Sequence, residues 1–140
     1  MADFTDDVRE LFEQANYVHV ATLMPDGSPQ SVAVWAGLEG ERVVFFTQAG
    51  AQKARNLDRD PRVALSVTDH DNPYRTARIR GRVVERRNGE AADAIMDQLS
   101  LRYTGEPFPM RGPNTVAYVI KPEKVSFTSL PFEHRPPGPA

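Results

Sequence analysis

A lysine and an arginine follow a small-residue turn near the middle of the chain. Lys53 and Arg55 lie in a short segment with a helical pattern, and the turn before it contains Gly50 and Ala51. Free backbone N–H groups at the start of a helix bind phosphate or carboxylate, and a nearby ammonium adds a charge-assisted hydrogen bond. The segment therefore predicts an anion site. The alternative interpretation is a solvated helix face.

Three further cations alternate along a later segment with a strand pattern. Arg78, Arg80 and Arg82 stand two residues apart, so their side chains share one face of that strand. Like charges at neighbouring positions repel one another, and an anionic partner would relieve the repulsion. The alternative is that these arginines pair with some of the nineteen acidic residues.

Other groups that could do chemistry are few. Tyr74 and Tyr103 could each donate a proton, although most tyrosines only pack and hydrogen-bond. Trp35 is the only tryptophan, and such a residue is more often a core or dimer-interface anchor than a ring that stacks on a ligand. The three histidines lack metal-ligand spacing, so no metal site is expected. No GxSxG, P-loop or GxGxxG motif occurs, which argues against serine hydrolases, P-loop NTPases and Rossmann domains.

Composition and length predict a single globular domain over residues 1–140. Hydrophobic residues make up 40% of the chain and charged residues 26%, as in ordinary soluble proteins. The net charge of −2 creates no field that favours nucleic acid. No apolar run approaches the roughly 20 residues of a membrane span, and the acidic N-terminus is unlike a signal peptide. Because cysteine is also absent, a cytoplasmic location is the expectation.

The elements that must position these residues are mostly strands. The apolar patterns predict strands over residues 17–23, 30–38, 42–47, 62–68, 75–86, 115–120 and 124–129. Helices are predicted over about residues 1–16, where Thr5 is the candidate N-cap, in the segment that ends at Pro61, and over residues 90–103. Gly81 marks a candidate bulge, and residues 130–140 are expected to form a loose tail. Consecutive hairpins favour an antiparallel barrel with helices at its ends or side.

Four segments match a known family in sequence and in order. They are VATLMPDGSPQSVAVW, FFTQAGAQKARNLDRDPRVALSV, NPYRTARIRGRVVE and LRYTGEPFP, and they run from about Val20 to Pro109. Together they resemble the split-barrel flavin and deazaflavin family related to pyridoxamine phosphate oxidase, and more narrowly its F420-dependent reductase branch. The run KARNLDRDPRVAL is the most specific piece. The resemblance implies a mainly β fold, a six-stranded antiparallel split β-barrel with flanking helices, which forms a homodimer with two cofactor grooves at the dimer interface.

The resemblance also implies which residues contact the cofactor. The phosphate and the tail of F420 would meet Thr47, Gln52, Lys53 and Arg55, and Asn56 belongs to the same run as a contact or a brace. The deazaflavin ring would lie over the second predicted strand, at Gln30, Ser31, Val32 and Ala33. Tyr74 and Arg75 match a position that reaches the pocket of the neighbouring subunit. The proton for the substrate could come from Tyr74, from Arg75 or from solvent.

The activity implied is that of an F420-dependent oxidoreductase, which transfers a hydride from reduced F420 to a conjugated, electron-poor small molecule. Two alternatives stay open. Some relatives carry a second basic residue just before the lysine, where this chain has Ala51 and Gln52, so FMN is the alternative cofactor. The same fold could also carry F420 without turnover. The polyglutamate tail of F420 would give the alternating arginines a use.

Overall fold

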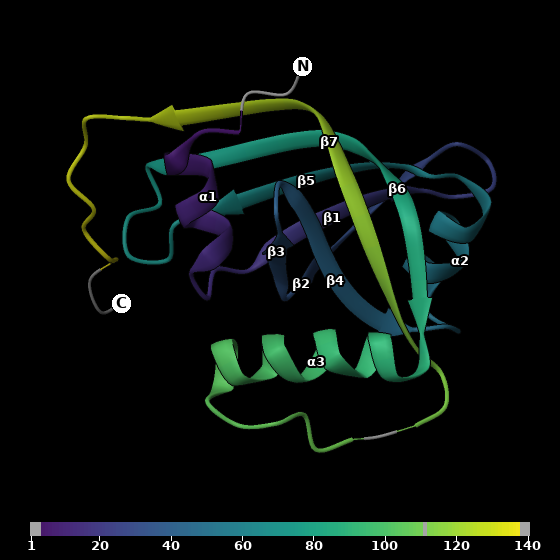
Figure 1. Cartoon of the computed structure of the whole chain (residues 1–140). Helices are drawn as coiled ribbons and strands as arrows, with labels where there is room; N and C mark the ends of the chain where they lie inside the picture. The colour runs from purple at the N-terminus through teal and green to yellow at the C-terminus, as the bar shows by residue number, and fades with distance from the viewer. Residues whose placement is uncertain (1–3, 111, 138–140) are drawn as a thin grey trace.

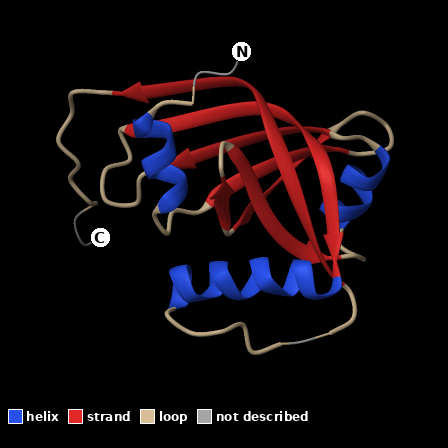
Figure 2. Ribbon diagram, in the orientation of Figure 1, coloured by secondary structure: helices blue, strands red, loops and turns tan. Residues whose placement is uncertain are grey.

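The computed structural model describes residues 4–110 and 112–137, in which seven strands form one antiparallel sheet and three helices flank it (Figures 1 and 2). The strands are β1 (Val18–Leu23), β2 (Pro29–Val34), β3 (Ala36–Glu39), β4 (Arg42–Gln48), β5 (Arg62–Thr68), β6 (Arg75–Asn88) and β7 (Thr115–Ser129). The helices are α1 (Asp6–Glu13), α2 (Gln52–Arg59) and α3 (Gly89–Thr104). The strand order in the sheet is β2-β1-β5-β6-β7-β4-β3.

The sheet curls because its two edge strands are joined by a single residue. Strand β2 ends at Val34 and β3 begins at Ala36, yet these strands stand at opposite ends of the strand order. The sheet must therefore bend until its edges approach each other at Trp35, and its strong curvature is visible in Figure 1. This arrangement confirms the predicted mainly β split barrel, but with seven strands in place of the predicted six.

Alternating side chains fill the interior of the barrel. Phe45, Ile79 and Tyr118 are among the largest fully buried residues, and they come from three different strands. Helix α1 covers one end of the barrel with Val8, Leu11 and Phe12, all buried at helical spacing. Its predicted cap is confirmed, since the Thr5 hydroxyl accepts a hydrogen bond of 3.4 Å from the backbone N–H of Val8.

Helix α3 packs against the outer face of the sheet instead of its interior. Ala92, Ile95 and Leu99 on this helix form a second apolar cluster with Val44 of β4 and Val119 of β7. Figure 1 shows α3 lying along that side of the sheet. The helix ends at Gly105, whose positive φ of 80° is the left-handed conformation that glycine adopts most readily.

Several predicted boundaries were wrong. The first helix ends at Glu13 and not at residue 16, because the buried Asn16 side chain donates to the carbonyl of Leu11 and satisfies that helix end. The single strand predicted over residues 30–38 is interrupted at Trp35, where the chain passes from one sheet edge to the other. The strands predicted over 115–120 and 124–129 are one continuous strand, β7, in which Pro122 stands opposite Gly81 at an irregularity.

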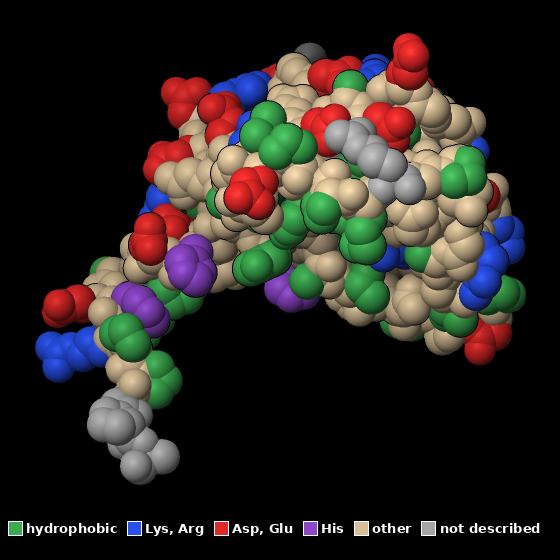
Figure 3. Space-filling model, turned by 90° about the horizontal axis from the view of Figure 1, so that it is seen from below, with side chains coloured by type: hydrophobic (Ala, Val, Ile, Leu, Met, Phe, Trp, Pro, Cys, Tyr) green, Lys and Arg blue, Asp and Glu red, His purple; other side chains and the backbone are tan. Residues whose placement is uncertain are grey.

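Two further predictions concern the C-terminal tail and the cellular location of the protein. Residues 130–137 form no helix or strand, as expected for the tail, and this arm projects from the body of the molecule (Figure 3). No helix in the described ranges is both long and apolar enough to cross a membrane. The cytoplasmic location stays a prediction.

The bulge at Gly81 generates a stability prediction. A Cβ atom at this position would lie 2.3 Å from the carbonyl oxygen of Lys121, which is far inside van der Waals contact with rigid backbone. Gly81→Ala should therefore lower the free energy of unfolding by about 1–3 kcal/mol in urea titrations followed by circular dichroism. Gly50→Ala is the matched control, because its Cβ would meet no atom within 4 Å, and equal stabilities of the two variants would contradict the prediction.

Candidate functional site

A groove of about 570 Å³ opens beside the point where the barrel closes. Its walls come from the end of β2, the end of β4, the start of α2 and the loop after α3. The described residues that line it are Tyr17, Ala33, Val34, Trp35, Phe46, Thr47, Gln48, Lys53, Phe108, Met110 and Gly112. Lys53 is the only charged side chain in this set. Hydrophobic side chains gather on the face of the molecule seen from below (Figure 3).

Aromatic rings form one wall of the groove. The Trp35 ring stacks on Tyr103 with 5.3 Å between centroids and meets the edges of Phe46 and Phe108 at 6.2 and 6.1 Å. Phe46 and Phe108 contact each other at 5.4 Å. Sequence reasoning did not select Phe46, although its alternation with the buried Phe45 places it on the outer face of β4. Phe108 belongs to the matched segment LRYTGEPFP but was not selected as a contact residue, and a loop brings it to the groove. The wall offers apolar surface to a flat ring.

Lys53 is the cation of the groove. Its side chain is partly buried in the first turn of α2, and no ion pair or hydrogen bond of its ammonium occurs within the described part of the chain. Burial lowers the pKa of Lys53 below the usual lysine range, because the charged form loses water. The N-cap of α2 is Ala51, which supplies no side-chain hydrogen bond to the helix N–H groups. An anion beside Lys53 would stabilise both the ammonium and these N–H groups.

The neighbours of Lys53 on α2 are engaged with one another. Asn56 is fully buried, donates to the Thr22 hydroxyl at 3.0 Å and accepts from the Gln52 amide at 2.8 Å. Arg55 is exposed and donates to the Gln52 side chain and to the Gly50 carbonyl. None of these three predicted contact residues, Gln52, Arg55 and Asn56, lines the groove. Asn56 braces the helix against β1, which was one of its two predicted roles.

The predicted ring-binding residues on β2 separate into two sets. Ala33 lines the groove, and Ser31 lies on the same exposed face but borders a second hollow. Gln30 and Val32 alternate with them and are partly buried; Val32 packs against the barrel core. The Oε1 atom of Gln30 is buried and accepts no hydrogen bond from any residue that the structure describes. Of the cofactor contacts that the resemblance implied, the structure thus brings Ala33, Thr47 and Lys53 together in one groove.

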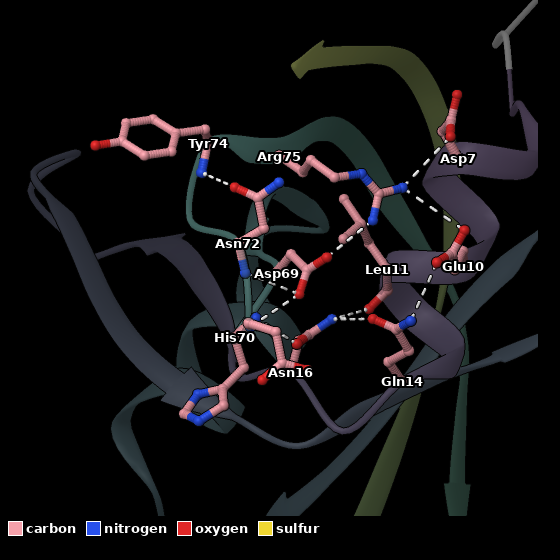
Figure 4. A network of polar contacts seen from close by, with 11 residues as sticks. Asp7, Glu10, Leu11, Gln14, Asn16, Asp69, His70, Asn72, Tyr74 and Arg75 are labelled. Atoms are coloured by element: carbon pink, nitrogen blue, oxygen red, sulfur yellow. Dashed lines mark hydrogen bonds and ion pairs between the residues drawn. The ribbon is translucent and has the colours of Figure 1, made fainter. Parts of the chain in front are cut away.

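Tyr74 and Arg75 lie at the start of β6, away from this groove. Arg75 donates to Asp69 at 2.8 Å and forms longer ion pairs with Asp7 and Glu10 of α1, so it ties the helix to the sheet (Figure 4). The ring of Tyr74 points away from this network and meets Phe132 edge-on at 5.3 Å. Its hydroxyl has no hydrogen bond in the described structure. The predicted reach of both residues into a neighbouring subunit stays a prediction.

Tyr103, the other candidate proton donor, is committed to the backbone. Its hydroxyl donates to the carbonyl of Asn16 at 2.5 Å and accepts from the N–H of Ala36 at 3.2 Å. Burial raises the pKa of Tyr103, so its proton stays in place. The residue supports Trp35 and the start of β3.

Comparisons with known proteins agree with this geometry. The family described as pyridoxamine 5'-phosphate oxidase matches residues 4–129. A solved structure named F420 reductase is 36% identical to the chain, covers 84% of this chain and 94% of its own, and superposes with a TM-score of 0.73. A curated pyridoxine/pyridoxamine 5'-phosphate oxidase of Rubrobacter xylanophilus is 26% identical over 89% of this chain and 70% of its own. A conserved hypothetical protein of Mycobacterium tuberculosis, 24% identical over 99% of this chain and 95% of its own, shares the fold with a TM-score of 0.78.

The family match spans nearly all of the described structure, including the barrel closure, the helix that carries Lys53 and both groove walls from β2 and β4. It confirms the resemblance to the split-barrel family, and the similarity to the F420 reductase agrees with the narrower branch. The chain therefore belongs to the pyridoxamine 5'-phosphate oxidase family, a family of oxidoreductases that bind flavin-type cofactors.

Proposed function

We propose that this protein is an F420-dependent oxidoreductase that reduces a conjugated, electron-poor small molecule. The observation that carries the proposal is the partly buried Lys53, which pairs with no described residue and is the one charged side chain among the described residues of a groove walled by aromatic rings. An ammonium beside free helix N–H groups suits a phosphate, and the apolar wall suits a flat ring. The 36% identical F420 reductase favours a deazaflavin as the ring system.

Each groove residue has a separate task in this proposal. Lys53 and the first N–H groups of α2 would hold the phosphate, and the hydroxyl of Thr47, which lines the same groove, would add a hydrogen bond. Ala33 has no side chain beyond Cβ, so a ring can approach the β2 backbone closely. Trp35 and Phe46 exclude water from one side of the groove. When it is bound, reduced F420 supplies the hydride, while the protein contributes binding, orientation and electrostatics.

The substrate proton has three candidate sources: Tyr74, Arg75 and solvent. Tyr74 suits the task better than Arg75, because its hydroxyl makes no hydrogen bond in the described structure and the Arg75 guanidinium already pairs with three carboxylates. Neither residue lines the groove of its own chain. The proposal therefore includes a homodimer, in which Tyr74 reaches the groove of the other subunit. It also includes a cytoplasmic location.

FMN is the second candidate cofactor. Its phosphate would suit Lys53 equally, and the curated relative is named a pyridoxine/pyridoxamine 5'-phosphate oxidase. With Ala51 and Gln52 before it, Lys53 is the only cation among the described residues that line the groove. A single cation suits the phosphate of either cofactor.

A side-by-side titration separates the two cofactors. We expect the purified protein to be colourless. We also expect its dissociation constant for F420, read from fluorescence, to be at least about tenfold lower than that for FMN, a difference of about 1.4 kcal/mol in binding free energy. Protein that is yellow as isolated, with oxidised-flavin absorbance, would instead identify FMN as the cofactor.

Replacing the groove lysine tests the anion site itself. Lys53→Met keeps most of the length of the side chain and removes its charge, so affinity for F420 and for FMN should fall about 10- to 100-fold, as expected for the loss of a charge-assisted hydrogen bond. The measurement is fluorescence titration of both cofactors. Lys121→Met is the matched control, since Lys121 is exposed on β7 outside the groove and its loss should leave both affinities unchanged. Unaltered binding by Lys53→Met would refute the phosphate site.

Turnover distinguishes an enzyme from a carrier. With reduced F420 in excess, we expect at least one member of a panel of quinones, enones and tetrapyrroles to cause recovery of oxidised F420 absorbance, in proportion to protein concentration. Tight F420 binding with no recovery across the panel would support a non-catalytic carrier.

A further inference from the structure

Tyr17 brings an uncommitted hydroxyl to the groove that contains Lys53. It stands one residue before β1, lines the groove and is 59% exposed. Its hydroxyl makes no hydrogen bond to any residue that the structure describes. Among the described residues that line the groove, hydroxyls occur at Tyr17 and Thr47 alone. Tyr17 therefore offers a hydrogen-bond donor that is free to meet a ligand.

The backbone on both sides of Tyr17 is firmly held. The Asn16 side chain donates to the Leu11 carbonyl at 2.9 Å and accepts from the N–H of His70 at 2.9 Å. Val18, which follows Tyr17, is fully buried in the barrel core. The exposed phenol thus projects from a fixed point of the chain.

The ring of Tyr17 belongs to the aromatic wall of the groove. It packs on Tyr103 with 6.1 Å between ring centroids, and Trp35 stacks on the same Tyr103 ring. The hydroxyl of Tyr103 is engaged by the backbone, whereas that of Tyr17 is not. Tyr17 is therefore the tyrosine of this wall whose hydroxyl can serve a ligand.

Tyr17 and Lys53 approach the groove from opposite ends of β1. Helix α2 is held near the end of that strand, where Asn56 donates to the Thr22 hydroxyl at 3.0 Å. Roughly 16 Å of extended chain lies between Thr22 and Tyr17. A ligand whose phosphate lies at Lys53 would direct its flat ring along the aromatic wall, toward Tyr17.

We propose that Tyr17 binds the substrate, and that its hydroxyl donates a hydrogen bond to a carbonyl oxygen conjugated with the double bond that is reduced. This inference rests on the proposed function, which supplies the hydride and places the phosphate at Lys53. It narrows the substrate class to conjugated carbonyl compounds such as enones and quinones. The exposed, fixed phenol selects them through their acceptor oxygen.

The hydrogen bond from Tyr17 has a role in turnover as well as in binding. When the hydride forms a C–H bond at one carbon of the double bond, the π electrons move to the carbonyl oxygen, and the cofactor is left oxidised. A proton from Tyr74, Arg75 or solvent then completes the substrate. A donor placed at an oxygen that gains charge stabilises the transition state more than the bound substrate.

The test uses menadione, an uncharged naphthoquinone with two carbonyl oxygens conjugated with one double bond. Trp35 is the only tryptophan and stands in the same wall, so quenching of its fluorescence reports binding. The chain has no cysteine, so menadione meets no thiol. We expect saturable quenching, and Tyr17→Phe should bind menadione about 3- to 10-fold more weakly, as for the loss of one hydrogen bond between neutral groups.

Two variants and two ligands separate this inference from the proposed function. Tyr17→Phe keeps the ring and its packing on Tyr103, so its affinity for F420 should change less than about twofold. Lys53→Met should lose affinity for F420 but bind the uncharged menadione like the unaltered protein. With reduced F420 as donor, Tyr17→Phe should lower kcat/KM for menadione at least about tenfold, after correction for the reaction without protein.

Equal menadione affinities of Tyr17→Phe and the unaltered protein would overturn the inference, because a ring that only packs, even against a second copy, is retained in phenylalanine. The absence of saturable quenching would also overturn it. So would an equal fall in the affinities of Tyr17→Phe for F420 and menadione, which would assign the hydroxyl to the cofactor.

Loss of menadione affinity in Tyr74→Phe with none in Tyr17→Phe would make Tyr74 the donor and likewise overturn the inference. Unaltered F420 binding by Lys53→Met would count against the proposed phosphate site alone, because menadione binding is measured without cofactor. Circular dichroism melting curves verify that each variant is folded.

Discussion

The structure depends on a covalent constraint at Trp35. One residue separates β2 from β3, although these strands are the two edges of a seven-stranded sheet, and no flat or gently twisted sheet could satisfy that connection. The closure then needs support. Tyr103 of α3 provides it by stacking on Trp35 and by hydrogen-bonding the backbone of Asn16 and Ala36. The aromatic wall of the groove is thus a consequence of how the barrel closes.

The position of Lys53 rests on buried polar contacts elsewhere on α2. Asn56 joins the helix to Thr22 of β1, and the hydroxyl of Tyr118 on β7 lies 2.9 Å from an Asp58 carboxylate oxygen and 3.3 Å from the Ala54 carbonyl. Burial raises the pKa of Tyr118 to about 12, so the hydroxyl stays protonated and remains a donor. A helix held from both sides can keep at the groove an ammonium that pairs with no described residue, because leaving the groove would break these contacts.

The predictions made from the sequence were most accurate where a pattern of a few neighbouring residues has a physical cause within those residues. The Thr5 cap, the Gly81 bulge and the small-residue entry to α2 each follow from the conformational needs of a few neighbouring residues. The predictions were less accurate where distant segments meet. The break at Trp35 depends on sheet closure, and Phe108 reaches the groove through a loop whose path no periodicity describes.

By itself, the sequence determined the family, the mainly β class and the cationic segment around Lys53, because short-range patterns and a specific run of residues carry that information. Only the tertiary structure decided which candidate residues share a site. It joined Ala33, Thr47 and Lys53, and it turned Asn56 and Arg75 toward structural partners. It also showed that, among the described residues, Arg78 and Arg80 lack the carboxylate partners of their neighbours. These outcomes depend on strand register and on sheet curvature, which bring together residues that are far apart in the chain.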